Sequence, residues 1–118
     1  MFTDLIVWQE AHALVLFIYS ITKHFPKEEI YGLTSQMRRA AVSISSNIAE
    51  GFNRQSKADK VHFYSMALSS LSEVQSQGMI ARDVTYMAGE DFSVLFEKSI
   101  RVSKLLNGLM RSIKYPNT

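Results

Sequence analysis

Four stretches of this 118-residue chain repeat apolar side chains every three or four positions, the spacing that returns a residue to the same face of an α-helix. The stretches run over about residues 4–24, 33–51, 56–85 and 89–114. No segment alternates apolar and polar residues for long enough to predict a β-strand. The chain holds only five Gly and two Pro, and so few turn residues favour a few long elements over a many-stranded sheet.

Local signals indicate where these helices begin and end. The first helix should end just before Pro26, because a residue that precedes Pro avoids the helical region. Gly51 is a plausible C′ residue that closes the second helix, and Ser56 is a plausible N-cap of the third. Gly78 lies inside the third helix, where it should cost roughly 1 kcal/mol relative to Ala. Close approach by a neighbouring helix would explain it.

Four amphipathic helices joined by short links predict a single all-α domain, an antiparallel up-down-up-down four-helix bundle. The chain has no Cys, which excludes disulfides and thiolate metal sites. The first residues do not resemble a secretory signal. Every stretch without a charged residue is shorter than the roughly 18 residues of a membrane span. We therefore expect a soluble, cytoplasmic protein.

The formal net charge of +2 hides a strong segregation along the chain. Residues 61–97 carry one basic and five acidic side chains, whereas residues 98–118 carry five basic side chains and no acidic one. The five basic residues fall within a broad arc of the fourth helix and are Lys98, Arg101, Lys104, Arg111 and Lys114. Such a surface favours a polyanionic partner. Alternatively, the cations complement the dipole of the helix at its C-terminal half.

The second helix has fewer charges than an exposed bundle helix normally carries. Between residues 33 and 51 they are Arg38, Arg39 and Glu50, and small residues occupy the side opposite the apolar stripe. We predict that a second copy of the chain covers this side. The alternative is a mildly polar, Ser-rich exposed face. The residues assigned to the interface between copies are Arg39, Val42, Ser43, Ser46, Asn47, Ala49, Glu50 and Arg54.

The charged residues of this face have two possible roles. Glu50 could form an ion pair with Arg54, one turn further on, or with Arg39 of another chain, and either pair would fix a helix junction or a contact between copies. The arginines could instead contact phosphate groups. The structural role is favoured because Ser and Ala dominate around these residues.

The sequence lacks the usual patterns of catalysis and metal binding. A di-iron bundle needs two Glu-x-x-His pairs, and here Asp59-x-x-His62 is a single imperfect copy. There is no Gly-rich phosphate loop and no nucleophile elbow. We expect no enzymatic activity, no cofactor and no metal. The tyrosines expected at rims of the bundle, with hydroxyls in water, are Tyr19, Tyr64 and Tyr86.

One segment is more specific than the physics of a bundle helix requires. Residues 31–54 read YGLTSQMRRAAVSISSNIAEGFNR, which resembles the signature of the bacterial four-helix bundle family named after the 23S ribosomal RNA intervening-sequence protein. The lead-in around Trp8, the junction at Phe25-Pro26 and the ending LLNGL at 105–109 resemble the family too, so the likeness covers nearly the whole chain. The departures lie in the third helix, where Gly78 replaces an apolar residue.

The resemblance implies an up-down bundle that assembles as a ring-shaped homopentamer. It also implies kinship with the accessory protein of diversity-generating retroelements, which binds nucleic acid and a reverse transcriptase. It implies no catalytic activity. A ring agrees with the low charge of the second helix, although that feature by itself does not set the number of subunits.

Together these features predict a non-enzymatic oligomeric protein that binds RNA or DNA through the basic surface of the fourth helix. Binding would rest on contacts to the phosphate backbone and would tolerate many sequences. The alternative is a protein-interaction scaffold for a polymerase or a ribonucleoprotein, in which the ring matters and nucleic acid does not bind.

Overall fold

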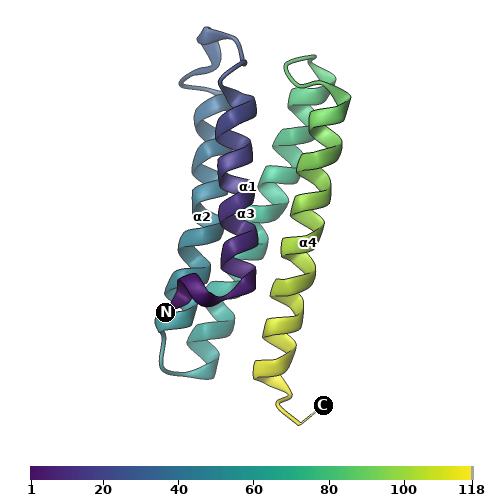
Figure 1. Cartoon of the computed structure of the whole chain (residues 1–118). Helices are drawn as coiled ribbons and strands as arrows, with labels where there is room; N and C mark the ends of the chain where they lie inside the picture. The colour runs from purple at the N-terminus through teal and green to yellow at the C-terminus, as the bar shows by residue number, and fades with distance from the viewer. Residues whose placement is uncertain (118) are drawn as a thin grey trace.

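The computed structural model describes residues 1–117, which form an all-α protein with four long helices (Figure 1). The helices are α1 (Ile6–Thr22), α2 (Leu33–Asn53), α3 (Lys57–Asp83) and α4 (Gly89–Lys114), and two short 3-10 helices are η1 (Phe2–Asp4) and η2 (Lys27–Glu29). No strand occurs within residues 1–117. The all-α prediction is therefore confirmed, with each helix within a few residues of its expected range.

The helices lie side by side in a bundle that measures 48 × 24 × 21 Å. α1 packs against α2 and α4, and α3 packs against the same two helices. The backbones of the diagonal partners, α1 with α3 and α2 with α4, do not approach each other closely within the described chain. The α1–α2 and α3–α4 connections lie at one end of the bundle, and the α2–α3 turn and the C-terminal residues lie at the other (Figure 1).

The core follows the predicted periodicity most closely on α2 and α4. On α2, fully buried side chains recur at Met37, Ala41, Ile44 and Ile48. Polar contacts also cross the interior, because the buried Ser99 accepts a hydrogen bond from Gln75 Nε2 of α3 at 2.9 Å. None of the helices in residues 1–117 combines the length and apolar character that crossing a membrane requires.

The C-terminal end of α2 differs from the prediction. The helix continues to Asn53, and Gly51 lies buried inside it without a positive φ, so it is not a C′ residue. A Cβ at Gly51 would lie 2.6 Å from Cε1 of Tyr64 on α3. The missing side chain thus lets the Tyr64 ring pack directly on the α2 backbone. Tyr64 is only 2% exposed, and its expected position at a wet rim is wrong.

Two predictions about α3 are confirmed. Ser56 is the N-cap, and its Oγ accepts a hydrogen bond from the Asp59 backbone N–H at 3.1 Å. Gly78 marks a close approach, because a Cβ there would lie 3.2 Å from Cδ2 of Leu95 on α4. The glycine that weakens α3 therefore permits closer packing between α3 and α4.

A side-chain contact joins the two connections at the end of the bundle that holds η2. The Tyr86 hydroxyl donates to Glu29 Oε2 at 2.9 Å, and Glu29 Oε1 accepts from the backbone N–H of Leu33 at 3.0 Å. The bond from Leu33, and then the bond from Tyr86, favour the carboxylate and lower the pKa of Glu29. The same carboxylate raises the pKa of Tyr86. Glu29 thus secures both the start of α2 and the α3–α4 turn.

Replacing Tyr86 with Phe should lower the melting temperature near neutral pH and weaken its dependence on acid pH. A lowered pKa means that Glu29 stabilises the fold above the ordinary carboxyl pKa of 4.5, and that this stabilisation is lost as the pH falls through the folded-state value. The ring contact with Phe25, 5.7 Å between centroids, is kept in the variant. Melting curves followed by circular dichroism from pH 3 to pH 7 provide the measurement. Parallel pH profiles for the two proteins would contradict the assignment.

Candidate interaction surfaces

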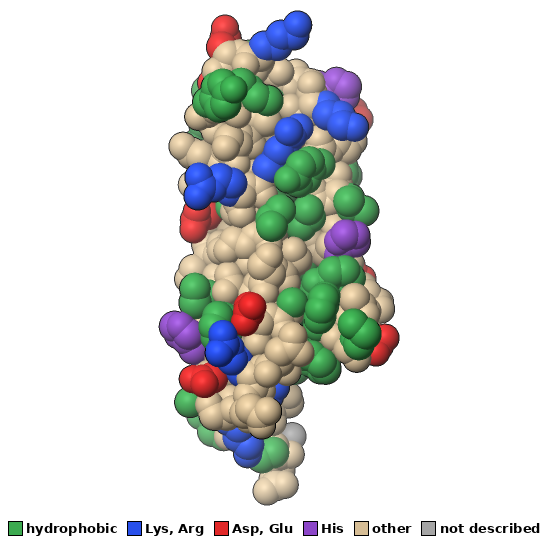
Figure 2. Space-filling model, turned by 90° about the vertical axis from the view of Figure 1, so that its left-hand side faces the viewer, with side chains coloured by type: hydrophobic (Ala, Val, Ile, Leu, Met, Phe, Trp, Pro, Cys, Tyr) green, Lys and Arg blue, Asp and Glu red, His purple; other side chains and the backbone are tan. Residues whose placement is uncertain are grey.

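The outward face of α2 carries few charges along its middle. Val42 is 39% exposed, Ser46 is exposed and Ala49 is half-buried. Figure 2 views the bundle from the α2 side, and the middle of this face shows mainly uncharged polar side chains and backbone. Charged side chains lie mostly toward its two ends, and hydrophobic side chains gather on the neighbouring α1 flank (Figure 2).

Four of the eight residues predicted to lie between copies make contacts inside the subunit, and two of them are Ser43 and Asn47. The hydroxyls of Ser43 on α2 and Ser70 on α3 are 2.8 Å apart and form a hydrogen bond. Asn47 Nδ2 donates to the Ser43 carbonyl oxygen at 2.8 Å and to the Ser43 hydroxyl at 3.1 Å. The bond between Ser43 and Ser70 therefore joins α2 to α3, and Asn47 holds Ser43 within α2.

The ion pair predicted between Glu50 and Arg54 is present. Arg54 Nη2 lies 3.1 Å from Glu50 Oε2, and the guanidinium also lies over the Phe63 ring at 4.6 Å from its centroid. Glu50 is thus already paired within its own chain. Arg39, which was the other possible partner of Glu50, is exposed and has no acidic partner among residues 1–117.

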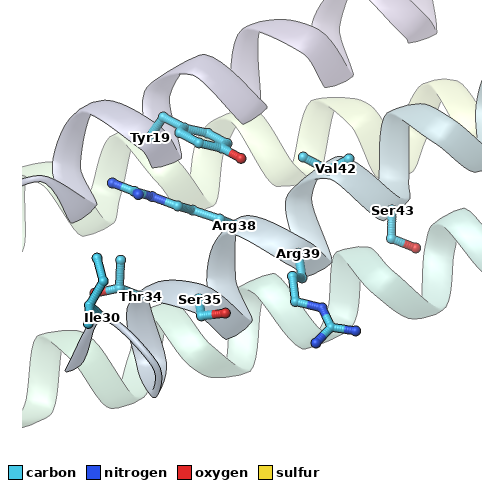
Figure 3. Close-up of a pocket in the computed structure, with 8 residues that line it drawn as sticks. All are labelled: Tyr19, Ile30, Thr34, Ser35, Arg38, Arg39, Val42 and Ser43. Atoms are coloured by element: carbon cyan, nitrogen blue, oxygen red, sulfur yellow. The ribbon is translucent and has the colours of Figure 1, made fainter.

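A groove of about 630 Å³ lies on α2 next to Arg39 and reaches α1 (Figure 3). Its lining residues are Tyr19, Ile30, Thr34, Ser35, Arg38, Arg39, Val42 and Ser43. Arg38 extends from α2 toward Tyr19 on α1, with its guanidinium 4.8 Å from the ring centroid, and its Nε donates to Thr22 Oγ1 at 3.0 Å. Arg39 points away from Tyr19 (Figure 3). We call this site the arginine groove.

A second, smaller groove of about 330 Å³ lies on the other side of Arg39, between α2 and α3. Arg39 and Glu73 both line it, but the two side chains are not within ion-pair distance. Gln77 also lines this groove, and its Oε1 is buried without a hydrogen-bond partner in the described structure. Arg39 therefore lies between the two grooves, and its guanidinium has no hydrogen-bond partner among residues 1–117.

The outward face of α1 also carries exposed apolar residues, which were not predicted from the sequence. This helix of 17 residues has Glu10 as its single formal charge, and Ile6 and Leu16 are 59% and 57% exposed. The sequence predicts one buried apolar face for α1, and it does not show that further apolar residues of this helix are exposed. The low charge of α1 was the available signal. The surface with few charges therefore extends from α2 onto α1.

The structure divides the five basic residues predicted to bind nucleic acid into two groups. Arg101 Nε pairs with Glu10 Oε1 of α1 at 2.9 Å, and Lys98 Nζ lies 5.9 Å from the centroid of the Phe17 ring. These two residues of α4 therefore contact α1. The other three, Lys104, Arg111 and Lys114, are exposed and have no acidic partner among the described residues.

Arg111 and Lys114 lie in the last turn of α4, at the end of the bundle that holds the α2–α3 turn. Lys57, the first residue of α3, lines a pocket of about 390 Å³ together with Lys114. Sequence reasoning did not join these lysines because 57 positions separate them and only the fold brings them together. We call Lys57, Arg111 and Lys114 the basic end.

No histidine belongs to a candidate metal site among residues 1–117. His12 stacks on Trp8 with 4.8 Å between ring centroids. Residues 1–117 contain no group of three or more His, Asp or Glu side chains placed to hold a metal ion.

Four long helices that pack side by side define this chain as an all-α helical bundle. The family model of the 23S rRNA-intervening sequence protein matches residues 3–108, and the chain belongs to this family. The resemblance carried by residues 31–54 is therefore confirmed.

A solved structure from Bacteroides thetaiotaomicron has a similar fold, with a TM-score of 0.84. It is described as a protein of unknown function from the S23 ribosomal protein family. The two chains are 22% identical over 94% of this chain and 99% of the other, which demonstrates a shared fold. No curated protein matches this chain.

Proposed function

We propose that this protein is a non-enzymatic nucleic-acid-binding protein in which antiparallel up-down-up-down bundles assemble side by side into a ring. The observation that carries the proposal is the basic end, where Arg111 and Lys114 are exposed without acidic partners among residues 1–117 and Lys57 lines one pocket with Lys114. The ring would place several copies of these cations at one rim. The resemblance to the family implies five subunits.

Unpaired cations on one end of a bundle favour the phosphate backbone of RNA or DNA as the partner. Repeating the basic end around a ring raises the local potential without any new residue. Contacts to phosphate position a nucleic acid but do not read its bases, so we expect little sequence preference. The names of the matched family and of the solved relative refer to 23S rRNA and to a ribosomal protein, which makes RNA the first probe to try.

The surface with few charges supports the assembly. Exposed apolar side chains on α1 and the small residues of α2 form one continuous face, and such patches mark interaction sites. A closed ring uses two different faces of each subunit, so that the α2 side of one copy meets another side of the next.

Reversing the charge at Arg111 and Lys114 together should weaken nucleic-acid binding at least about tenfold. In gel shifts with single- and double-stranded RNA and DNA, the wild-type affinity should fall as salt rises. The variant Arg111→Glu/Lys114→Glu should show a shallower slope, by about 0.9 for each phosphate that it no longer neutralises on duplex DNA. Both side chains are exposed, so the variant should keep the fold.

The matched control is Lys23→Glu/Lys27→Glu, which makes the same change of charge at two exposed residues of the opposite end. This control should bind like the wild type. Equal binding by the wild type and the Arg111→Glu/Lys114→Glu variant would remove the basic end from consideration. If no nucleic acid shifts at either salt concentration while a protein partner is retained at high salt, the scaffold is the correct function.

A further inference from the structure

The arginine groove collects positive charge and hydrogen-bond donors without any carboxylate. Both charged residues in its lining are arginines, and Arg39 has no acidic partner in the described chain. Thr34 also lines the groove, and its hydroxyl has no hydrogen-bond partner among residues 1–117. Guanidinium groups bind carboxylate and phosphate through paired, charge-assisted hydrogen bonds. The groove is therefore shaped for an anion that this subunit does not supply.

We propose that the anion is a carboxylate of a second copy of this chain, supplied by Glu97 on α4, so that the arginine groove is complete only in the assembly. The inference rests on the proposed self-association, and it adds the contact that fixes the relative height of neighbouring subunits along the bundle axis. Glu97 is exposed and has no cationic partner in the described chain. It lies in the second half of the acidic segment 61–97, and it is too far from the N-terminus of α4 for the helix dipole to compensate it.

The position of Glu97 along the bundle matches that of the groove. α2 and α4 begin at the same end and occupy diagonally opposite corners (Figure 1). At 1.5 Å per residue, Arg39 lies about 9 Å from the start of α2 and Glu97 about 12 Å from the start of α4. In a ring whose axis runs along the bundles, neighbouring copies are related by rotation alone, so groups at one height face groups at the same height. The contact requires that the α2 side of one copy meets the α4 side of the next.

The same register brings a second pair of opposite charges together. Further along the two helices, Glu50 lies about 26 Å from the start of α2 and Lys104 about 23 Å from the start of α4. The order along α2 is therefore basic and then acidic, and the order along α4 is acidic and then basic. The unpaired Arg39 and Glu97, with Lys104 level with the Glu50 carboxylate that Arg54 already contacts in its own chain, favour a second copy over an unrelated acidic partner.

A nucleic acid is a poorer occupant of the arginine groove. The groove lies toward one end of the bundle, and Arg111 of the basic end lies about 33 Å from the start of α4, toward the other end. Ile30 and Val42 contribute apolar walls, which suit a protein surface better than a hydrated phosphate backbone. Bound phosphate at the groove is instead one outcome of the test below.

A charge-swap series tests the contact. The subunit mass is measured by light scattering over a dilution series for the wild type, Arg39→Glu, Glu97→Arg and the double variant. Each single variant places like charges opposite each other and should shift the dissociation midpoint to at least about tenfold higher concentration. The double variant restores an opposite pair and should recover most of the affinity. Arg39 and Glu97 are exposed, and circular dichroism checks that each variant is folded.

The outcomes separate this inference from the proposed function. A wild type that remains a single subunit at every concentration would overturn both the assembly and the contact. A wild-type assembly that is indifferent to both single changes, or a double variant no better than the singles, would overturn the contact alone. Loss of inorganic phosphate binding in Arg39→Glu, with assembly unchanged, would assign the groove to a free anion and overturn the contact.

Discussion

Replacing Gly51 with Ala should lower the melting temperature by about 8 °C, although Ala is the better helix former. The new Cβ would lie 2.6 Å and 2.9 Å from two carbons of the buried Tyr64 ring, which is held between α2 and α3. Overpacking of this kind costs about 1–3 kcal/mol, and we expect a cost at the upper end of this range because the contact is so short. The gain in helix propensity returns about 1 kcal/mol. The net loss of about 2 kcal/mol is measured by thermal unfolding.

Gly108→Ala is the matched control for this experiment. Gly108 also lies inside a long helix, but it is exposed and nothing lies within 4 Å of a Cβ placed there. This change should raise the melting temperature by about 4 °C, because the helix propensity improves without a clash. Adding Tyr64→Leu to Gly51→Ala should recover part of the stability. A similar increase for both glycine variants would contradict the close contact between α2 and α3.

Placing a carboxylate at Val42 should dissociate the assembly, with a dissociation constant raised by more than about a hundredfold. Val42 is partly exposed near the middle of α2, so Val42→Asp in a lone subunit should change the stability by no more than about 0.5 kcal/mol. Between two subunits the same carboxylate would be buried without a partner, at a cost of several kcal/mol. Light scattering measures the mass, and circular dichroism confirms the retained fold.

Val84→Asp provides the comparison for Val42→Asp. Val84 is a similarly exposed valine that follows α3, at the end of the bundle and away from the α2 face. Its variant should keep the mass of the wild-type particle. A Val42→Asp protein that also keeps the full mass at low concentration would show that the α2 face is open to solvent.

The helices and most of the core could be predicted because they depend on local periodicity. Ile44 and Ile48 fall on one face of α2 whatever lies beyond, so their burial follows from the 3.6-residue repeat. Gly51 shows the limit of such reasoning. A glycine near a helix end suits both a C′ position and a close helix contact, and the difference depends on where the Tyr64 ring of another helix lies.

The sequence predicts which residues make up the candidate surfaces, but it does not predict which other residues their side chains contact. The sequence alone identifies the basic residues of α4, yet it cannot show that Arg101 is held by Glu10, which is 91 positions away. The same limit explains why Lys57 was not joined to Lys114, and why the bond between Tyr86 and Glu29 was not foreseen. An ion pair across the fold forms only where two charged groups lie within a few ångströms of each other, and the sequence does not give that distance.

The mass of the native wild-type particle tests the central claim most directly, which is that copies of this chain close against one another over the α2 face. Native mass spectrometry or light scattering should show one species of fixed size, a whole-number multiple of the 13.4 kDa subunit greater than two, that persists on dilution. A 13.4 kDa species at every concentration would contradict the account, because Val42 and Ala49 would then face water.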